Sequence, residues 1–349
     1  MPHVRRLFLV LAAVLGVVAL GLAILAVRAN RFLDAPMAVP EDGVIFAIAT
    51  GSTFSAISDR LAQHGYIEHS DWLRWYARLT EQANAVQAGE YRIDAGTTPR
   101  QLLEMFVSGE VELYSFTIVE GWTYRELVQA LAGDPNVDKT IEFEDWPAVL
   151  ESLTVAYEHP EGLFLPETYH FPRGTRDVDL LGQAFSLMQA TLAAEWRERA
   201  ENIPISTPYE ALILASIVEK ETALVTERPQ IAGVFTRRLE RNMRLQTDPT
   251  VIYGIGVDFD GNLTRRHLRE DTPYNTYTRG GLPPTPIALP GRAAINAALH
   301  PAEGTSLYFV ATGLGDGSHK FSDTKAEHDQ AVREYLARQR AARDNAGGQ

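Results

Sequence analysis

Two glutamates that could transfer protons, Glu219 and Glu221, lie two positions apart at the end of a long apolar stretch. The stretch predicts a helix over residues 208–225, because Thr207 is a suitable N-cap and Pro208 fits the first helical position. No glycine or further proline interrupts it. The surroundings of each carboxyl decide whether it can act as a general acid near neutral pH.

A helical wheel separates the two glutamates. At about 100° per residue, Glu221 falls near the centre of the apolar face, whereas Glu219 falls on the opposite face with Ser216 and Lys220. Desolvation on an apolar face raises the pKa of a carboxyl, as a general acid requires. The alternative for Glu221 is a structural role, as a carboxylate at the edge of the core paired with a nearby arginine.

Composition limits the classes of protein that can position these groups. The chain has 349 residues, 45% hydrophobic and 22% charged, which is typical of a folded protein with more than one domain. Its net charge of −13 argues against a nucleic-acid partner, so an anionic polymer would have to be held by local arginines, hydrogen bonds and stacking. The absence of cysteine excludes disulfides and a thiol nucleophile.

Leu7–Val27 contains no polar side chain and has the length of a helix that crosses a bilayer. Arginines flank both ends, and the short preceding tail favours a cytoplasmic N-terminus. We expect a cytoplasmic tail and anchor over residues 1–29 and a linker over 30–42, with the rest of the chain outside the cytoplasm. A cleaved signal peptide is the alternative, although its apolar run would be shorter.

A pattern of aromatic, Ile, Gly, Thr and an aliphatic residue recurs three times after this segment. Each copy predicts a strand, a glycine turn, a threonine N-cap and an amphipathic helix. The turn-and-cap pairs are Gly51 and Thr53, Gly96 and Thr98, and Gly121 and Thr123. The first copy resembles half of a LysM peptidoglycan-binding module, and a generic strand–turn–helix unit is the alternative. Together with the later helices, these copies predict an α+β fold.

Several later segments could form a binding surface. Leu245–Gly254 and Tyr274–Tyr277 place short polar and aromatic side chains beside proline-rich loops, whose restricted backbone suits a preformed site. A helix from Thr226 to Arg241 has a basic edge that includes Arg237 and Arg238; it is either a solvated face or one wall of an anion-binding groove. The histidines lack metal-ligand spacing, so neither a metal nor another cofactor is expected.

Five stretches in order resemble the endolytic murein transglycosylase family (YceG-like, MltG). They are Leu214–Thr222, Leu245–Gly254, Tyr274–Tyr277, Gly281–Pro284 and Leu307–Val310. The resemblance implies a single-pass inner-membrane protein with a periplasmic LysM-like subdomain over 43–112 and a catalytic region over 113–345. It also implies cleavage inside nascent peptidoglycan strands, which would terminate elongation, and a peptidoglycan synthase complex is a possible partner.

The resemblance also assigns roles to residues. The catalytic glutamate of lytic transglycosylases precedes a small hydroxyl residue, which favours Glu221 with Thr222 and leaves Glu219 as the second choice. Candidate substrate-binding residues are Thr222, Gln246, Asp248, Tyr274, Asn275 and Tyr277. Asp248 is either a second carboxylate or a turn opener before proline.

One carboxyl is sufficient for the implied reaction. Protonated Glu221 would release the N-acetylglucosamine side of the bond, and its carboxylate would accept the proton of the muramyl C6 hydroxyl as that oxygen closes a 1,6-anhydro ring. A lysozyme-like hydrolase that uses water is one alternative. A non-catalytic wall-binding scaffold is another.

Overall fold

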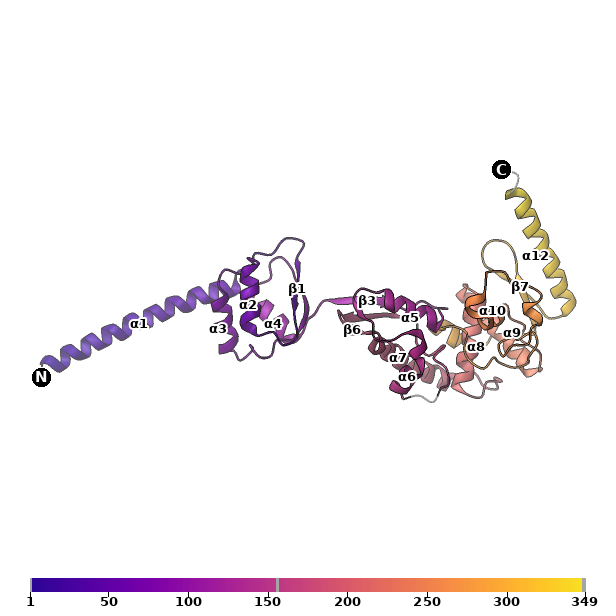
Figure 1. Cartoon of the computed structure of the whole chain (residues 1–349), viewed down its shortest axis with the longest axis horizontal. Coiled ribbons are helices and arrows are strands. Elements are labelled where there is room, and N and C mark those ends of the chain that lie inside the picture. Colours follow the sequence, from indigo (N-terminus) through magenta and orange to yellow (C-terminus); the bar gives the residue numbers. More distant parts are fainter. Residues whose placement is uncertain (1, 155–156, 347–349) are drawn as a thin grey trace. The chain divides into compact units, whose positions relative to one another are not determined.

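The computed structural model describes residues 2–154 and 157–346 (Figure 1). Helices and two-stranded sheets alternate along it, which confirms the α+β class. The chain forms two compact units. The first comprises the residues up to Tyr114 with His170–Gly174, and the second comprises Ser115–Tyr169 and the residues from Thr175 onward.

The first unit begins with α1 (Pro2–Asp34), a long continuous helix (Figure 1). From Leu7 to Asp34 it is long and apolar enough to cross a membrane, and no other helix among the described residues has this length and composition. Exposed leucine, valine and isoleucine side chains cover this helix. Helices of this kind include both membrane anchors and signal sequences.

The structure differs from the linker expected over residues 30–42. Leu33 and Met37 are buried in the core of the first unit, and the Arg100 guanidinium donates to the carboxylate of Asp34. The backbone N–H of Met37 donates to the carbonyl of Thr97. The residues that follow the apolar helix therefore pack as part of the folded unit.

An antiparallel sheet and three helices complete the first unit. Strand β1 pairs with β2 so that Phe46 lies opposite Tyr91, and both rings are buried with Phe106. The elements are β1 (Val44–Ile48), α2 (Phe54–Gln63), α3 (Ser70–Leu79), β2 (Gly89–Ile93) and α4 (Pro99–Ser108).

The three predicted strand–turn–helix copies are confirmed. The third consists of β3 (Leu113–Thr117) and α5 (Tyr124–Gly133). In every copy the turn glycine has φ between 79° and 90°, a conformation that glycine adopts without strain. In every copy the threonine hydroxyl accepts a hydrogen bond from the backbone N–H three residues later, as an N-cap does.

The second unit contains the remaining helices and short sheets, except that residues 113–114 of β3 and 170–172 of β5 belong to the first unit. Strands β4 and β6 pair in parallel, β7 and β8 pair antiparallel, and β3 pairs with β5. The strands are β4 (Val137–Asp138), β5 (Thr168–Pro172), β6 (Thr175–Arg176), β7 (Tyr308–Ala311) and β8 (His319–Ser322). The helices are α6 (Trp146–Ser152), α7 (Asp177–Glu198), α8 (Pro208–Glu221), α9 (Arg228–Glu240), α10 (Asp248–Ile255), α11 (Arg292–Leu299) and α12 (Lys325–Ala346).

Helix α8 lies at the centre of this unit, in contact with α7, α9, α10 and α11. Thr207 is the N-cap and Pro208 occupies the first turn, as the sequence predicted, and Glu210 completes a capping box with Thr207. The helix ends at Glu221 rather than near residue 225, because Thr222 adopts an extended backbone with φ −147° and ψ 136°. Glu221, the candidate acid, is therefore the last residue of the helix.

Candidate active site

Glu221 lies on the wall of a cavity of about 380 Å³ in the second unit. The cavity is lined by residues from α8, α9, the loop before α10, β7, β8 and α12. Polar and charged lining residues include Gln246, Asp248, Tyr277, Arg238, His319 and Lys325. Apolar lining residues include Phe235, Leu245 and Phe309. A cavity with this mixture can hold a hydroxyl-rich ligand against apolar surfaces.

Burial raises the pKa of the Glu221 carboxyl to about 7. The nearby negative charge of Asp248 acts in the same direction. A hydrogen bond from Thr247 and the positive charges of His319 and Arg238 oppose the shift. The direction agrees with the expectation from the helical wheel, and the carboxyl can hold a proton near neutral pH.

Glu219 has a different environment, and the prediction that it faces a polar side of the helix is wrong. Its side chain is 4% exposed, its Oε1 accepts from Arg228 at 2.6 Å and its Oε2 accepts from the backbone N–H of Gly291 at 2.9 Å. Ser216, placed on the same polar side, is fully buried. The wheel failed because neighbouring helices surround α8, so its polar side chains have internal partners.

Thr247 is a functional candidate that the sequence did not reveal. Its hydroxyl donates to Oε1 of Glu221, and its backbone N–H donates to the hydroxyl oxygen of Thr276 at 3.1 Å. The hydroxyl of Thr250 in turn donates to the carbonyl of Thr247 at 2.8 Å. This buried threonine cluster fixes one oxygen of the Glu221 carboxyl and leaves Oε2 for a proton or a substrate.

Three of the predicted substrate-binding residues line the cavity with Glu221: Gln246, Asp248 and Tyr277. Gln246 has φ +52°, a conformation that is uncommon outside glycine and that recurs at functional sites. The Tyr277 hydroxyl donates to Oδ1 of Asp248 at 2.5 Å. Asp248 is also the first residue of α10. It therefore both begins a helix, as its position before a proline suggested, and lines the cavity.

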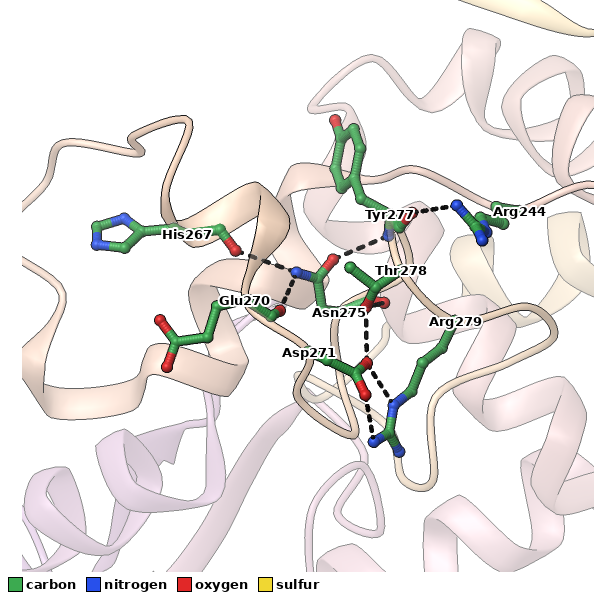
Figure 2. A network of polar contacts seen from close by, with 8 residues as sticks. All are labelled: Arg244, His267, Glu270, Asp271, Asn275, Tyr277, Thr278 and Arg279. Atoms are coloured by element: carbon green, nitrogen blue, oxygen red, sulfur yellow. Dashed lines mark hydrogen bonds and ion pairs between the residues drawn. The ribbon is translucent and has the colours of Figure 1, made fainter.

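Asn275 is not among the residues that line this cavity, and it instead holds a loop together (Figure 2). Its side chain is 1% exposed and donates to the carbonyls of His267 at 3.0 Å and Glu270 at 2.6 Å. Its amide oxygen accepts from the backbone N–H of Tyr277 at 2.9 Å, so it positions a residue that does line the cavity.

Thr222 and Tyr274 are also absent from the cavity lining. The buried Thr222 hydroxyl accepts from the backbone N–H of Leu224 at 3.0 Å, which stabilises the turn after α8. The Tyr274 hydroxyl is hydrogen-bonded to that of Thr285 at 2.8 Å. Neither side chain is therefore positioned to bind a ligand in this cavity, although the sequence predicted a binding role for both.

Of the two alternatives for the basic edge of α9, a solvated face is wrong for Arg238, because this residue is buried in the wall of the cavity. Its side chain is 7% exposed, and it donates to the backbone carbonyls of Leu307 and Leu245, each at 2.6 Å. Leu245 and Leu307 lie outside α9, so the helical pattern of α9 alone could not predict these contacts. The guanidinium therefore joins the wall of the cavity.

The model of the YceG-like family matches residues 46–334, most of the chain. The chain belongs to the YceG-like family. A relative in Bacillus subtilis (strain 168), named endolytic murein transglycosylase, is 29% identical over 83% of this chain and 84% of the relative. A protein of the same name in Streptococcus pneumoniae D39 is 28% identical over 84% of this chain and 58% of its own length.

A solved structure supports the fold of this YceG-like chain. The crystal structure of a yceG-like protein from Listeria monocytogenes superposes with a TM-score of 0.52 and 26% identity. The match covers 83% of this chain and 99% of the other. The likeness therefore extends over most of both chains.

Replacing Thr247 should change the position and the pKa of the Glu221 carboxyl in this YceG-like chain without removing the carboxyl. For Thr247→Val we expect turnover to fall about 10- to 100-fold, because misplacing a reacting group slightly has costs of this size. Since the Thr247 hydrogen bond lowers the pKa of Glu221, its loss should also raise the pH at which activity declines. Thr247→Ser keeps the hydroxyl and should restore both; an unchanged pH profile in Thr247→Val would contradict the role.

Proposed function

We propose that this chain is a lytic transglycosylase that cuts peptidoglycan glycan strands internally, between N-acetylmuramic acid and N-acetylglucosamine. The observation that carries the proposal is the Glu221 carboxyl on a cavity wall, with its pKa raised to about 7 by burial. The names of the Bacillus and Streptococcus relatives support the same reaction.

The proposed reaction uses one carboxyl twice. Thr247 occupies Oε1 of Glu221, so the proton on Oε2 passes to the glycosidic oxygen as the bond from that oxygen to muramyl C1 breaks. The muramyl C6 hydroxyl oxygen then bonds to C1, and its proton returns to the ionised carboxylate. The products are a 1,6-anhydromuramyl end and a free N-acetylglucosamine end, and no water is consumed.

The cavity also contains Asp248, which keeps a hydrolytic reaction as the second candidate. A hydrolase that retains configuration would need a second carboxyl about 5–5.5 Å from the acid, and an inverting enzyme about 6.5–9.5 Å. Asp248 accepts a hydrogen bond from the Tyr277 hydroxyl and begins α10, so a positioning role accounts for it. We propose that Asp248, Tyr277 and Gln246 bind hydroxyl and N-acetyl groups of the glycan.

The pH dependence of cleavage tests the acid. The protonated form of Glu221 is active, and a pKa of about 7 means that this form declines as the pH rises through that value. We therefore expect the rate on uncrosslinked glycan strands to fall about tenfold per pH unit above about 8. A rate that stays constant or rises between about pH 6 and 9 would contradict Glu221 as the proton donor.

The first unit supports a complementary proposal. We propose that α1 anchors the chain in the inner membrane with its N-terminus in the cytoplasm, and that the LysM-like first unit binds glycan in the periplasm. The unit has a cavity of about 360 Å³ that includes Ser52, Thr53, Arg74 and Asn84. Loss of glycan binding in Asn84→Ala, with cleavage chemistry retained, is the expected result of a pull-down with purified peptidoglycan.

A further inference from the structure

The cavity that contains Glu221 also gathers basic side chains, although the chain has a net charge of −13. Arg238 comes from α9, His319 from β8, and Lys325 and His328 from the start of α12. The acidic side chains in the same lining are Glu221 and Asp248. When Glu221 is protonated, Asp248 is the remaining negative charge of the lining, and it is hydrogen-bonded to Tyr277.

Arg238 is a buried cation without a carboxylate partner among the described residues. Its Nε and Nη1 donate to backbone carbonyls, which are neutral acceptors. Its Nη2 has no hydrogen-bond partner in the described part of the chain and is not among the fully buried atoms. Burying a charge is costly unless an opposite charge compensates it, so this wall favours an anionic ligand.

Two more basic side chains, Lys325 and His319, line the same cavity. Lys325 pairs with Asp329 one turn along α12, but both side chains are about half exposed or more, and exposed pairs of this kind are weak. Lys325 can therefore exchange this partner for a ligand. The Nδ1 of His319 is hydrogen-bonded to Oε2 of Glu227 at 2.7 Å, which fixes the ring that lines the cavity.

We propose that Arg238, His319 and Lys325 form a subsite for a carboxylate carried by the muramyl side chain of the glycan. The inference rests on the proposed function and adds a determinant of specificity to it. Guanidinium and ammonium groups bind carboxylates through charge-assisted hydrogen bonds, and a chain this acidic needs such a local arrangement to hold an anionic strand. The carboxylate is either the free lactyl group of a peptide-free strand or a carboxylate of the stem peptide.

The test combines changes in the substrate with changes in the protein. Full-length chain in detergent would be given uncrosslinked strands in three forms: with stem peptides, without peptides, and without peptides but with the lactyl carboxyls converted to methyl amides. Kinetics would be measured for wild type, Lys325→Gln and Lys320→Gln. Lys320 is the matched control, because it lies next to His319 on β8 but is exposed and outside the cavity lining.

We expect Lys325→Gln to raise KM about 5- to 10-fold on a carboxylate-bearing strand and to leave KM on the methyl-amide strand unchanged. Lys320→Gln should behave as wild type on all three. An effect on peptide-free strands identifies the lactyl carboxylate, and an effect confined to peptide-bearing strands identifies a peptide carboxylate.

Two results would overturn the subsite: wild type that processes all three strands alike, or equal losses for Lys325→Gln and Lys320→Gln. Failure of the proposed function would look different, because wild type would then produce no anhydro ends from any strand. Arg238 is unsuitable as the first variant, since it also holds the carbonyls of Leu245 and Leu307.

Discussion

Glu221→Gln should lower the rate of glycan cleavage by about 10²- to 10⁴-fold while the fold is retained. The amide has the shape of the carboxyl, and its oxygen can still accept the hydrogen bond from Thr247. It has no acidic proton to give to the glycosidic oxygen. The rate is measured on uncrosslinked glycan strands at about pH 6, where the wild-type carboxyl is largely protonated.

Stability provides the control for this variant. The folded-state pKa of Glu221 is raised above its ordinary value of 4.5, so the folded state loses stability as the pH rises toward 7 and the unfolded state ionises first. Glutamine does not ionise, and Glu221→Gln should therefore be at least as stable as wild type at pH 8. Retained cleavage in a folded Glu221→Gln protein would refute the assignment of the acid.

Glu219→Gln should have the opposite profile, with a loss of about 3 kcal/mol in the free energy of unfolding and little effect on chemistry. The substitution removes the charge that compensates the buried Arg228 guanidinium, whose Nε and Nη1 already have no hydrogen-bond partner among the described residues. The loss is limited because Glu120 remains 3.2 Å from Arg228. Urea unfolding gives the stability, and the rate per folded molecule gives the chemistry.

The two variants form a matched pair, since the same substitution is made two positions apart on one helix. If Glu219→Gln were as stable as wild type but inactive, the acid would be Glu219, the second choice from the sequence. A destabilised but active Glu219→Gln together with a stable but inactive Glu221→Gln supports the roles inferred from the structure.

Local features of the fold could be predicted from the sequence because their causes are local. The glycine turns and threonine caps of the three strand–turn–helix copies depend on neighbouring residues, and so does the Thr207 N-cap of α8.

The parts that could not be predicted depend on contacts between distant segments. The Thr247 hydroxyl meets Glu221 across 26 positions of sequence, and Arg238 reaches Leu307 across 69. A helical wheel cannot show that α8 is enclosed by other helices, so it misplaced Glu219 and Ser216. It placed Glu221 on an apolar face, and in the structure burial raises the pKa of this carboxyl as that position predicts.

The end group of the product tests most directly whether the strand is cut by its own C6 hydroxyl rather than by water. Full-length wild-type protein would be incubated with uncrosslinked glycan strands, and the new muramyl ends would be identified by mass spectrometry. We predict 1,6-anhydromuramyl ends, which are lighter than hydrolysed ends by one water. Reducing muramyl ends, or strands that remain uncut, would contradict the proposal.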